Sequence, residues 1–176
     1  MAFQLVPALL LTFASSAALG DDVSEENTKL LVEAVGVMND AFAYYSSIDD
    51  PRFKCLTAVL PVYEPENHFA VYRYHFQGQN GESGTYINYC VNLTATETAE
   101  FGFSPCEDGV FDSTGQGYYF NGVNCFVGRF PLLGNVYCLL WVKRDFVDSF
   151  PEECVAQFDQ NCGTERYALY DKEQCS

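Results

Sequence analysis

Apolar positions near the N-terminus recur with a helical period. Between residues 31 and 45 they are spaced three and four apart, which corresponds to one face of a 3.6-residue repeat. Asp22, followed three residues later by Glu25, resembles a capping box and predicts the start of this helix. The Asp49-Asp50-Pro51 turn predicts its end. The apolar face consists of Leu31, Ala34, Val35, Met38, Ala41, Phe42 and Tyr45.

The middle of the chain has the pattern of short antiparallel strands. Aromatic and β-branched residues are concentrated in five segments separated by turn-forming residues, and Asn80-Gly81 is a strong hairpin dipeptide. Residues 97–117 are less regular. The predicted strand segments are residues 53–63, 68–76, 85–94, 123–130 and 136–144.

A short second helix is expected near the C-terminus. Ser149, with Glu152 three residues later, predicts its N-cap, with Pro151 in the first turn and an end at about Gln160. A helix, many short strands and a short helix fit an all-β, antiparallel up-and-down barrel, and they also fit a two-sheet sandwich. The periodicity alone does not choose between these architectures.

The first twenty residues resemble a secretory signal peptide. Residues 6–18 are almost wholly apolar, and small residues at Ala18 and Gly20 predict cleavage before Asp21. We therefore expect a secreted, extracellular protein with a signal peptide at 1–20 and a single domain at 21–176. No later stretch is long and apolar enough to suggest a membrane span. Asn92-Leu93-Thr94 is the only glycosylation sequon and predicts a glycan on Asn92.

Eight cysteines follow the predicted signal peptide. An even number in an oxidising compartment predicts up to four disulfides. A zinc site needs closely spaced Cys or Cys/His ligands, whereas the nearest cysteines here occupy positions 154 and 162. We therefore expect no metal site.

Charge and composition disfavour several function classes. The net charge of −15 disfavours nucleic acid and anionic membrane surfaces as partners. Only His68 and His75 are available as histidine bases, and no nucleophile motif or Gly-rich phosphate loop stands out. We expect neither enzymatic activity nor a cofactor.

Several short motifs follow one another in a fixed order. They are Asp40-Ala41-Phe42 near the start, then Cys125-Phe126-Val127, Leu139-Leu140-Trp141 and Cys154. Together they resemble the histamine-binding-type lipocalins of tick saliva, whose signature reads Cys-Asp-aliphatic, Glu-Leu-Trp/Tyr and Cys. The resemblance implies a lipocalin-type β-barrel with an N-terminal helix and a short C-terminal helix. It also implies a role in modulating host inflammation or haemostasis, as a form of host defence evasion.

The resemblance implies two disulfides, Cys55–Cys175 and Cys125–Cys154. The remaining four cysteines allow three pairings. Among these we favour Cys90–Cys106 and Cys138–Cys162, because each closes a short loop between neighbouring elements.

The departures from the signature concern the ligand. In amine-binding members of the family, the two acids of the signature hold the ammonium group of the ligand, and here Phe126 and Leu139 occupy those positions. Strand alternation adds Tyr137 and Trp141 to the same wall. A buried ammonium without a carboxylate is costly to desolvate. We therefore expect an apolar or amphipathic small ligand, such as an eicosanoid or a fatty acid.

Further candidate ligand contacts are charged or lie in the first motif. Asp40, beside Phe42, either contacts an amine or only ends the helix face. Arg73 and His75 are candidates to bind a lipid carboxylate if their face of the strand points inward. In the alternative orientation, the aromatic residues between and beside them fill the core.

Two other functions stay open. One is histamine or another biogenic amine as the ligand. The other is binding of a host protein through the barrel loops, which a filled barrel would favour and for which Gly117-Tyr118-Tyr119-Phe120 is the candidate loop. We expect the protein to be a monomer.

Overall fold

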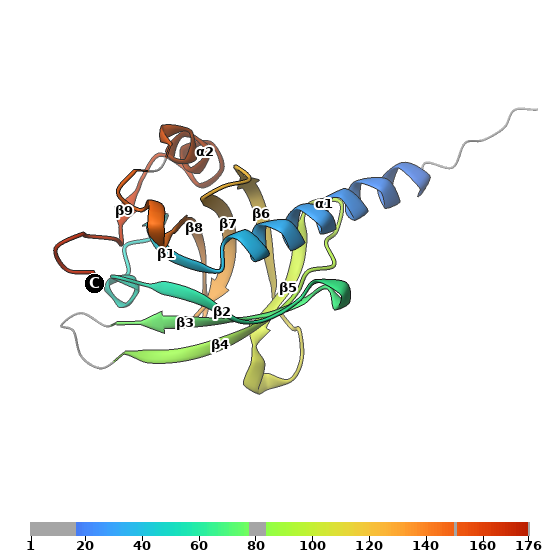
Figure 1. Ribbon diagram of the computed structural model, residues 1–176, viewed down its shortest axis with the longest axis horizontal. Helices are drawn as coiled ribbons and strands as arrows, with labels where there is room; N and C mark the ends of the chain where they lie inside the picture. Colours follow the sequence, from blue (N-terminus) through green and yellow to red (C-terminus); the bar gives the residue numbers. More distant parts are fainter. Residues whose placement is uncertain (1–16, 78–83, 150, 176) are drawn as a thin grey trace, which may run out of the picture.

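The computed structural model describes residues 17–77, 84–149 and 151–175 and shows a β-barrel with one helix across its mouth and one on its outer wall (Figure 1). The helices are α1 (Ala17–Val37) and α2 (Glu152–Cys162). The strands are β1 (Asp40–Ser46), β2 (Thr57–Glu64), β3 (Phe69–Phe76), β4 (Thr85–Asn92), β5 (Glu100–Pro105), β6 (Thr114–Phe120), β7 (Cys125–Leu132), β8 (Asn135–Lys143) and β9 (Tyr167–Ala168). In this part of the chain, no helix is long and apolar enough to span a membrane.

The first eight strands close into an antiparallel barrel. Each of β2 to β7 pairs with the next strand along the chain, and β1 pairs with both β8 and β2, so the sheet closes on itself. The second half of β1 also pairs with β9. This topology confirms the up-and-down lipocalin-type barrel and excludes the sandwich. The irregular segment of the sequence contains β5 and the first part of β6.

The N-terminal helix has different boundaries from those that the periodicity predicts. α1 ends at Val37, and Ala41, Phe42 and Tyr45 lie on β1. Apolar residues at 41, 42 and 45 fit both a helical and an alternating pattern, so spacing alone could not separate them. The predicted cap at Asp22 is also wrong in this chain, since the helix begins upstream and Asp22 lies inside it.

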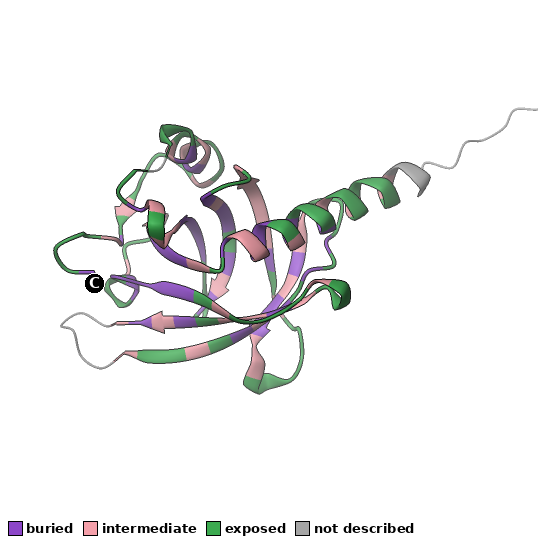
Figure 2. Cartoon of the chain, in the orientation of Figure 1, coloured by how far each residue is buried: buried purple, intermediate pink, exposed green. Residues whose placement is uncertain are grey.

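The barrel has one apolar core inside its wall and a second core outside it. Alternation along β8 sends Leu139 and Trp141 into the interior, whereas Leu140 and Val142 face outward. The outward residues are covered by α2, with Phe158 fully buried between helix and wall. Figure 2 shows the result: the barrel strands carry most of the buried positions, whereas α1 is largely exposed along its first half.

Two disulfides fasten α2 to the barrel. Cys125 of β7 is joined to Cys154 in the first part of the helix, and Cys138 of β8 is joined to Cys162 at its last position. The helix begins later than predicted: Pro151 is its N-cap residue, and Ser149 instead donates its backbone N–H to Phe146. Both ends of α2 are therefore covalently linked to adjacent strands.

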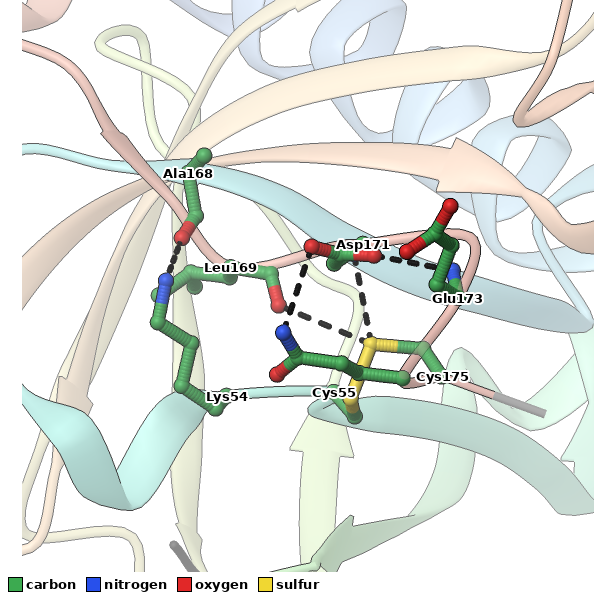
Figure 3. Close-up of a disulfide and its surroundings, with 8 residues drawn as sticks. Lys54, Cys55, Ala168, Leu169, Asp171, Glu173 and Cys175 are labelled. Carbon is green, nitrogen blue, oxygen red and sulfur yellow. Dashed lines mark hydrogen bonds between the residues drawn. A yellow bond between two sulfur atoms is a disulfide. The ribbon is translucent and has the colours of Figure 1, made fainter.

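The other two disulfides hold the long tail and the β4–β5 region. Cys55 is joined to Cys175, and the backbone N–H of Cys55 donates to the carbonyl of Leu169, so the tail lies along the segment before β2 (Figure 3). Cys90 of β4 is joined to Cys106, directly after β5. All four bridges have the pairing that the sequence favours, and the described residues contain no free cysteine.

A polar cluster closes the barrel at the end opposite α1. Tyr137 is fully buried there against Phe53, with ring centroids 4.3 Å apart, and its hydroxyl donates to Oδ2 of Asp50 at 2.7 Å. Arg52 donates to the same oxygen at 2.6 Å. The bond from Arg52, helped by the one from Tyr137, lowers the pKa of Asp50 to about 2. This carboxylate joins the segment before β2 to β8.

Asp50→Asn is expected to reduce stability at neutral pH by about 1–2 kcal/mol, because the lowered pKa reflects favourable interactions of the ionised form in the folded state. The contribution is present above the ordinary pKa near 4 and is lost as the pH falls toward about 2. Urea unfolding of wild type and Asp50→Asn should therefore give free energies that converge between pH 4 and pH 2. Asp49→Asn, a change at the exposed neighbouring carboxylate, is the matched control. A difference that stays constant over this range would contradict the assignment.

Candidate functional site

An apolar cavity of about 60 Å³ lies inside the barrel beneath α1. Its wall combines residues of the helix and of the segment after it with inward-facing residues from most of the strands. The lining side chains are aliphatic or aromatic, apart from the thioether of Met38. They are Leu31, Ala34, Val35, Met38, Ala41, Ala58, Tyr72, Tyr74, Val91, Leu93, Phe101, Phe103, Phe126, Phe130 and Trp141.

Strand alternation places the aromatic residues of the wall. On β3, Tyr72 and Tyr74 point inward, and on β5 Phe101 and Phe103 do the same. The rings pack on one another around Trp141, whose centroid lies 5.2 Å from that of Tyr74. Large rings thus fill most of the barrel and leave only a small space under the helix.

The helix is held over the cavity by apolar packing and a few hydrogen bonds. Leu31, Val35 and Met38 are buried against the barrel interior. The hydroxyl of Tyr72 donates to the carbonyl oxygens of Val35 and Met38 at 3.2 and 3.1 Å. The hydroxyl of Tyr63 donates to the carbonyl oxygen of Val32 at 2.8 Å. The C-terminal half of α1 is therefore the cover of the cavity.

The cavity wall carries no charge at physiological pH. Burial raises the pKa of Tyr72 and of Tyr74 far above the ordinary value of 10, so both hydroxyls stay neutral. The only buried side-chain nitrogen without a hydrogen-bond partner in the described chain is Nε1 of Trp141, a residue that is 4% exposed. The wall is apolar except for a few neutral donors.

Four of the predicted ligand contacts lie inside the barrel. Phe126 and Trp141 line the cavity. Leu139 and Tyr137 are fully buried in the interior but do not reach the cavity, and Tyr137 belongs to the closed end. Direct contact of these residues with a ligand stays a prediction.

Two of the predicted contacts lie outside the barrel. Phe42 faces outward into the core beneath α2 and the C-terminal tail, because its neighbours Ala41 and Ala43 take the inward positions. Asp40 pairs with Arg144, whose Nε lies 2.9 Å from Oδ2, and it does not line the cavity. As the first residue of β1, Asp40 does not end a helix face either.

Arg73 and His75 also face outward, so they cannot meet a ligand in the cavity. His75 stacks on Tyr86 with centroids 4.4 Å apart, and Arg73 donates to Oδ1 of Asn88 at 3.1 Å. The alternative orientation of β3 is the one observed. On the outer surface, Arg73 lies opposite Asn88 and His75 lies opposite Tyr86, both on β4. The residues that line the cavity therefore include no cation that could bind a lipid carboxylate.

Sequence reasoning missed most of the cavity wall. The contributions of α1, β5 and the inward tyrosines of β3 were not identified as ligand contacts. The alternation of Phe101 and Phe103 was the available signal, but it lies within a stretch rich in Pro and Gly. Which residues of α1 line the cavity depends on where the helix crosses the mouth of the barrel, and no local sequence pattern encodes that position.

The predicted interaction loop is not a loop. Residues 117–120 belong to β6, where Tyr118 and Tyr119 pack against the outer core and Phe120 packs against the inner one. A register shift between Gly117 and Tyr119 lets consecutive tyrosines face the same side. A different surface is hollowed, namely an open groove of about 730 Å³ bordered by β4, the β5–β6 connection and the β7–β8 turn.

Comparison with known proteins gives structural matches only. No protein-family model matches the sequence, and no curated protein matches it. The structure is similar to that of AM182 in complex with serotonin, with a TM-score of 0.59 and 17% identity over 80% of this chain and 89% of the other. It is similar to Japanin from Rhipicephalus appendiculatus bound to cholesterol (TM-score 0.55, 11% identity, 77% and 95% covered) and to lobster apocrustacyanin A1 (0.54, 10%, 83% and 87%). At these identities the likeness shows the fold alone: the chain has a lipocalin-type barrel.

Proposed function

We propose that this protein is a carrier that binds one small apolar or amphipathic molecule inside its barrel, beneath α1. The observation that carries the proposal is the cavity itself, which is lined by apolar and aromatic side chains and covered by a helix rather than by the barrel wall. Apolar walls with few polar groups are the usual composition of small-molecule sites. Two proteins with the same fold have serotonin and cholesterol as bound molecules.

The ligand enters by displacing the C-terminal half of α1. A cavity of about 60 Å³ is far below the several hundred Å³ of typical ligand sites. The helix cover is the part of the wall with the fewest backbone bonds to the rest, since its described polar contacts are side-chain bonds such as those from Tyr63 and Tyr72. Apolar contacts with the ligand replace the contacts of Leu31 and Met38 when the helix moves.

Binding of biogenic amines is the less favoured alternative. None of the residues that line the cavity has a carboxylate, and the one acid of the first motif, Asp40, is neutralised by Arg144. A buried ammonium would therefore have no partner of opposite charge, which costs several kcal/mol. Enzymatic activity is not part of the proposal, because the cavity wall offers no acid, base or nucleophile apart from tyrosine hydroxyls.

The biological setting proposed is outside the cell. The four disulfides fit an oxidising compartment, and we propose removal of residues 1–20 on secretion. Asn92 is exposed and stays our candidate for a glycan. Membership in the tick salivary lipocalins, and with it a role against host inflammation or haemostasis, rests on the motif resemblance and on the shared fold.

A second candidate function is binding of a host protein. The small volume of the cavity favours it, because aromatic side chains already occupy most of the barrel. The groove at the other end supplies an accessible surface, with exposed Tyr86 and Val136 beside acidic Glu107 and Asp108. This candidate requires no movement of α1.

Titration with small molecules separates the candidates. Trp141 is the only tryptophan and lines the cavity, so its emission reports on occupancy. We expect a saturable change with 1-octanol and no change with histamine at the same concentrations. Sub-micromolar histamine binding would refute the apolar-ligand proposal. No response to any molecule, even with Tyr72→Phe to loosen the helix, would favour the protein-binding candidate.

A further inference from the structure

Trp141 carries a buried N–H that has no hydrogen-bond acceptor in the described structure. Its Nε1 is buried and has no hydrogen-bond partner, although its ring lies in the cavity wall between Tyr74 and Phe130. An indole N–H is only a donor, so its missing partner must be an acceptor. A buried donor left unpaired bears its full desolvation penalty, and such groups are rare in folded proteins.

Charged ligands find no partner at the same place. The residues lining the cavity include no Asp, Glu, Lys, Arg or His. The predicted cations Arg73 and His75 lie on the outer surface of β3, and Asp40 is paired with Arg144. An ammonium or a carboxylate in the cavity would stay unpaired, and burial of an unpaired charge is strongly unfavourable.

A second donor becomes free when the helix moves. The hydroxyl of Tyr72 donates to the carbonyls of Val35, near the end of α1 that covers the cavity, and of Met38, directly after it. Displacement of this end by a ligand removes both acceptors from Tyr72. The lining residues of an occupied cavity therefore offer neutral donors only, among them Nε1 of Trp141 and the hydroxyl of Tyr72, in an otherwise apolar wall.

We propose that the ligand is an uncharged, mostly apolar molecule with an oxygen acceptor, such as an alcohol, ketone or ester, that accepts a hydrogen bond from Nε1 of Trp141. This inference rests on the proposed function, and it narrows the ligand to neutral lipids. It removes the fatty acids that the sequence suggested, because their carboxylate has no cation to meet in the cavity.

Four ligands of equal chain length test the inference: 1-octanol, octanoate, octylamine and 1-octene, each measured by isothermal titration calorimetry at pH 7. We expect 1-octanol to bind at least about a hundredfold more tightly than octanoate or octylamine, because the charged groups must be buried unpaired. Octanoate or octylamine binding as tightly as 1-octanol would show that the head group stays in solvent and would overturn the inference, while the carrier function would stand. No binding of any of the four would refute both.

Two independent measurements test the proposed hydrogen bond from Nε1 of Trp141 to the ligand. With a single tryptophan, the ¹⁵N-labelled protein gives one indole N–H cross peak, which we expect to shift downfield with 1-octanol and not with 1-octene. Trp141→Phe should lower the affinity for 1-octanol by about tenfold more than the affinity for 1-octene, as expected for loss of one buried hydrogen bond. Phe101→Leu, in the same wall, is the control and should change both affinities equally. An indole peak that responds identically to both ligands would overturn the assignment of Trp141, even if the Trp141→Phe variant failed to fold.

Discussion

Replacement of both cysteines of the longest bridge, as Cys55→Ser with Cys175→Ser, is expected to lower the free energy of unfolding by about 4–5 kcal/mol in the chain-entropy account. The bridge joins residues 120 positions apart, so its loss frees most of the barrel sequence in the unfolded state. In the folded state it also anchors the tail beside the segment before β2 (Figure 3). The Leu169 carbonyl of the tail accepts from the N–H of Cys55. Urea unfolding of the oxidised proteins, followed by far-UV circular dichroism, measures the change.

The shortest bridge provides the control. Cys90 and Cys106 are only 16 positions apart, and their joint replacement by serine is expected to cost about 3 kcal/mol. Equal losses for the two pairs, or a larger loss for the short one, would contradict the loop-length argument. Such a result would place the stabilisation in local contacts around each bridge.

Removal of one buried ring inside the barrel is expected to destabilise the fold and to strengthen ligand binding. Phe103 is 1% exposed, lines the cavity and stacks on Tyr89 with centroids 4.6 Å apart. Phe103→Ala should cost about 3–5 kcal/mol of stability, as large-to-small changes in a core do. The same change enlarges the cavity, so binding of 1-octanol should require less displacement of α1.

Phe158→Ala is the matched control. Phe158 is also fully buried, but it lies in the outer core under α2, on the other side of the barrel wall. We expect a similar loss of stability with no gain in affinity. Thermal unfolding with and without 1-octanol measures both the loss of stability and the change in affinity, since a ligand that binds only the folded state raises the melting temperature. An equal ligand-induced rise in the two variants would place the binding site elsewhere.

The barrel was predictable because its strands carry strong local signals. Alternating aromatic and branched residues marked β3, β4, β7 and β8, and the motif resemblance chose the barrel over the sandwich. The weak point was the junction between α1 and β1. Ala41, Phe42 and Tyr45 satisfy two periods at once, and only pairing with β2 and β8 shows that they lie on a strand.

The site was less predictable than the fold. Phe126 and Trp141 line the cavity; the motif resemblance pointed to Phe126, and strand alternation added Trp141. The outward direction of Arg73 and His75 depends on strand register, which a one-residue shift reverses, and the sequence left both orientations open. The groups that cover the cavity belong to α1 and the residue after it, and their contacts are tertiary. No local pattern could have placed Leu31 or Met38 over the mouth of the barrel.

The four disulfides enclose residues 55–175 in covalent loops, and α1 lies outside all of them. Bridges to β7 and β8 hold α2 against the wall, so that side of the barrel behaves as a cross-linked network. The helix over the cavity is joined to this network only through the peptide chain at β1. No disulfide therefore restrains α1 when it moves away from the mouth of the barrel, and only non-covalent contacts hold it there. Disulfide formation can therefore make the barrel rigid without making α1 rigid.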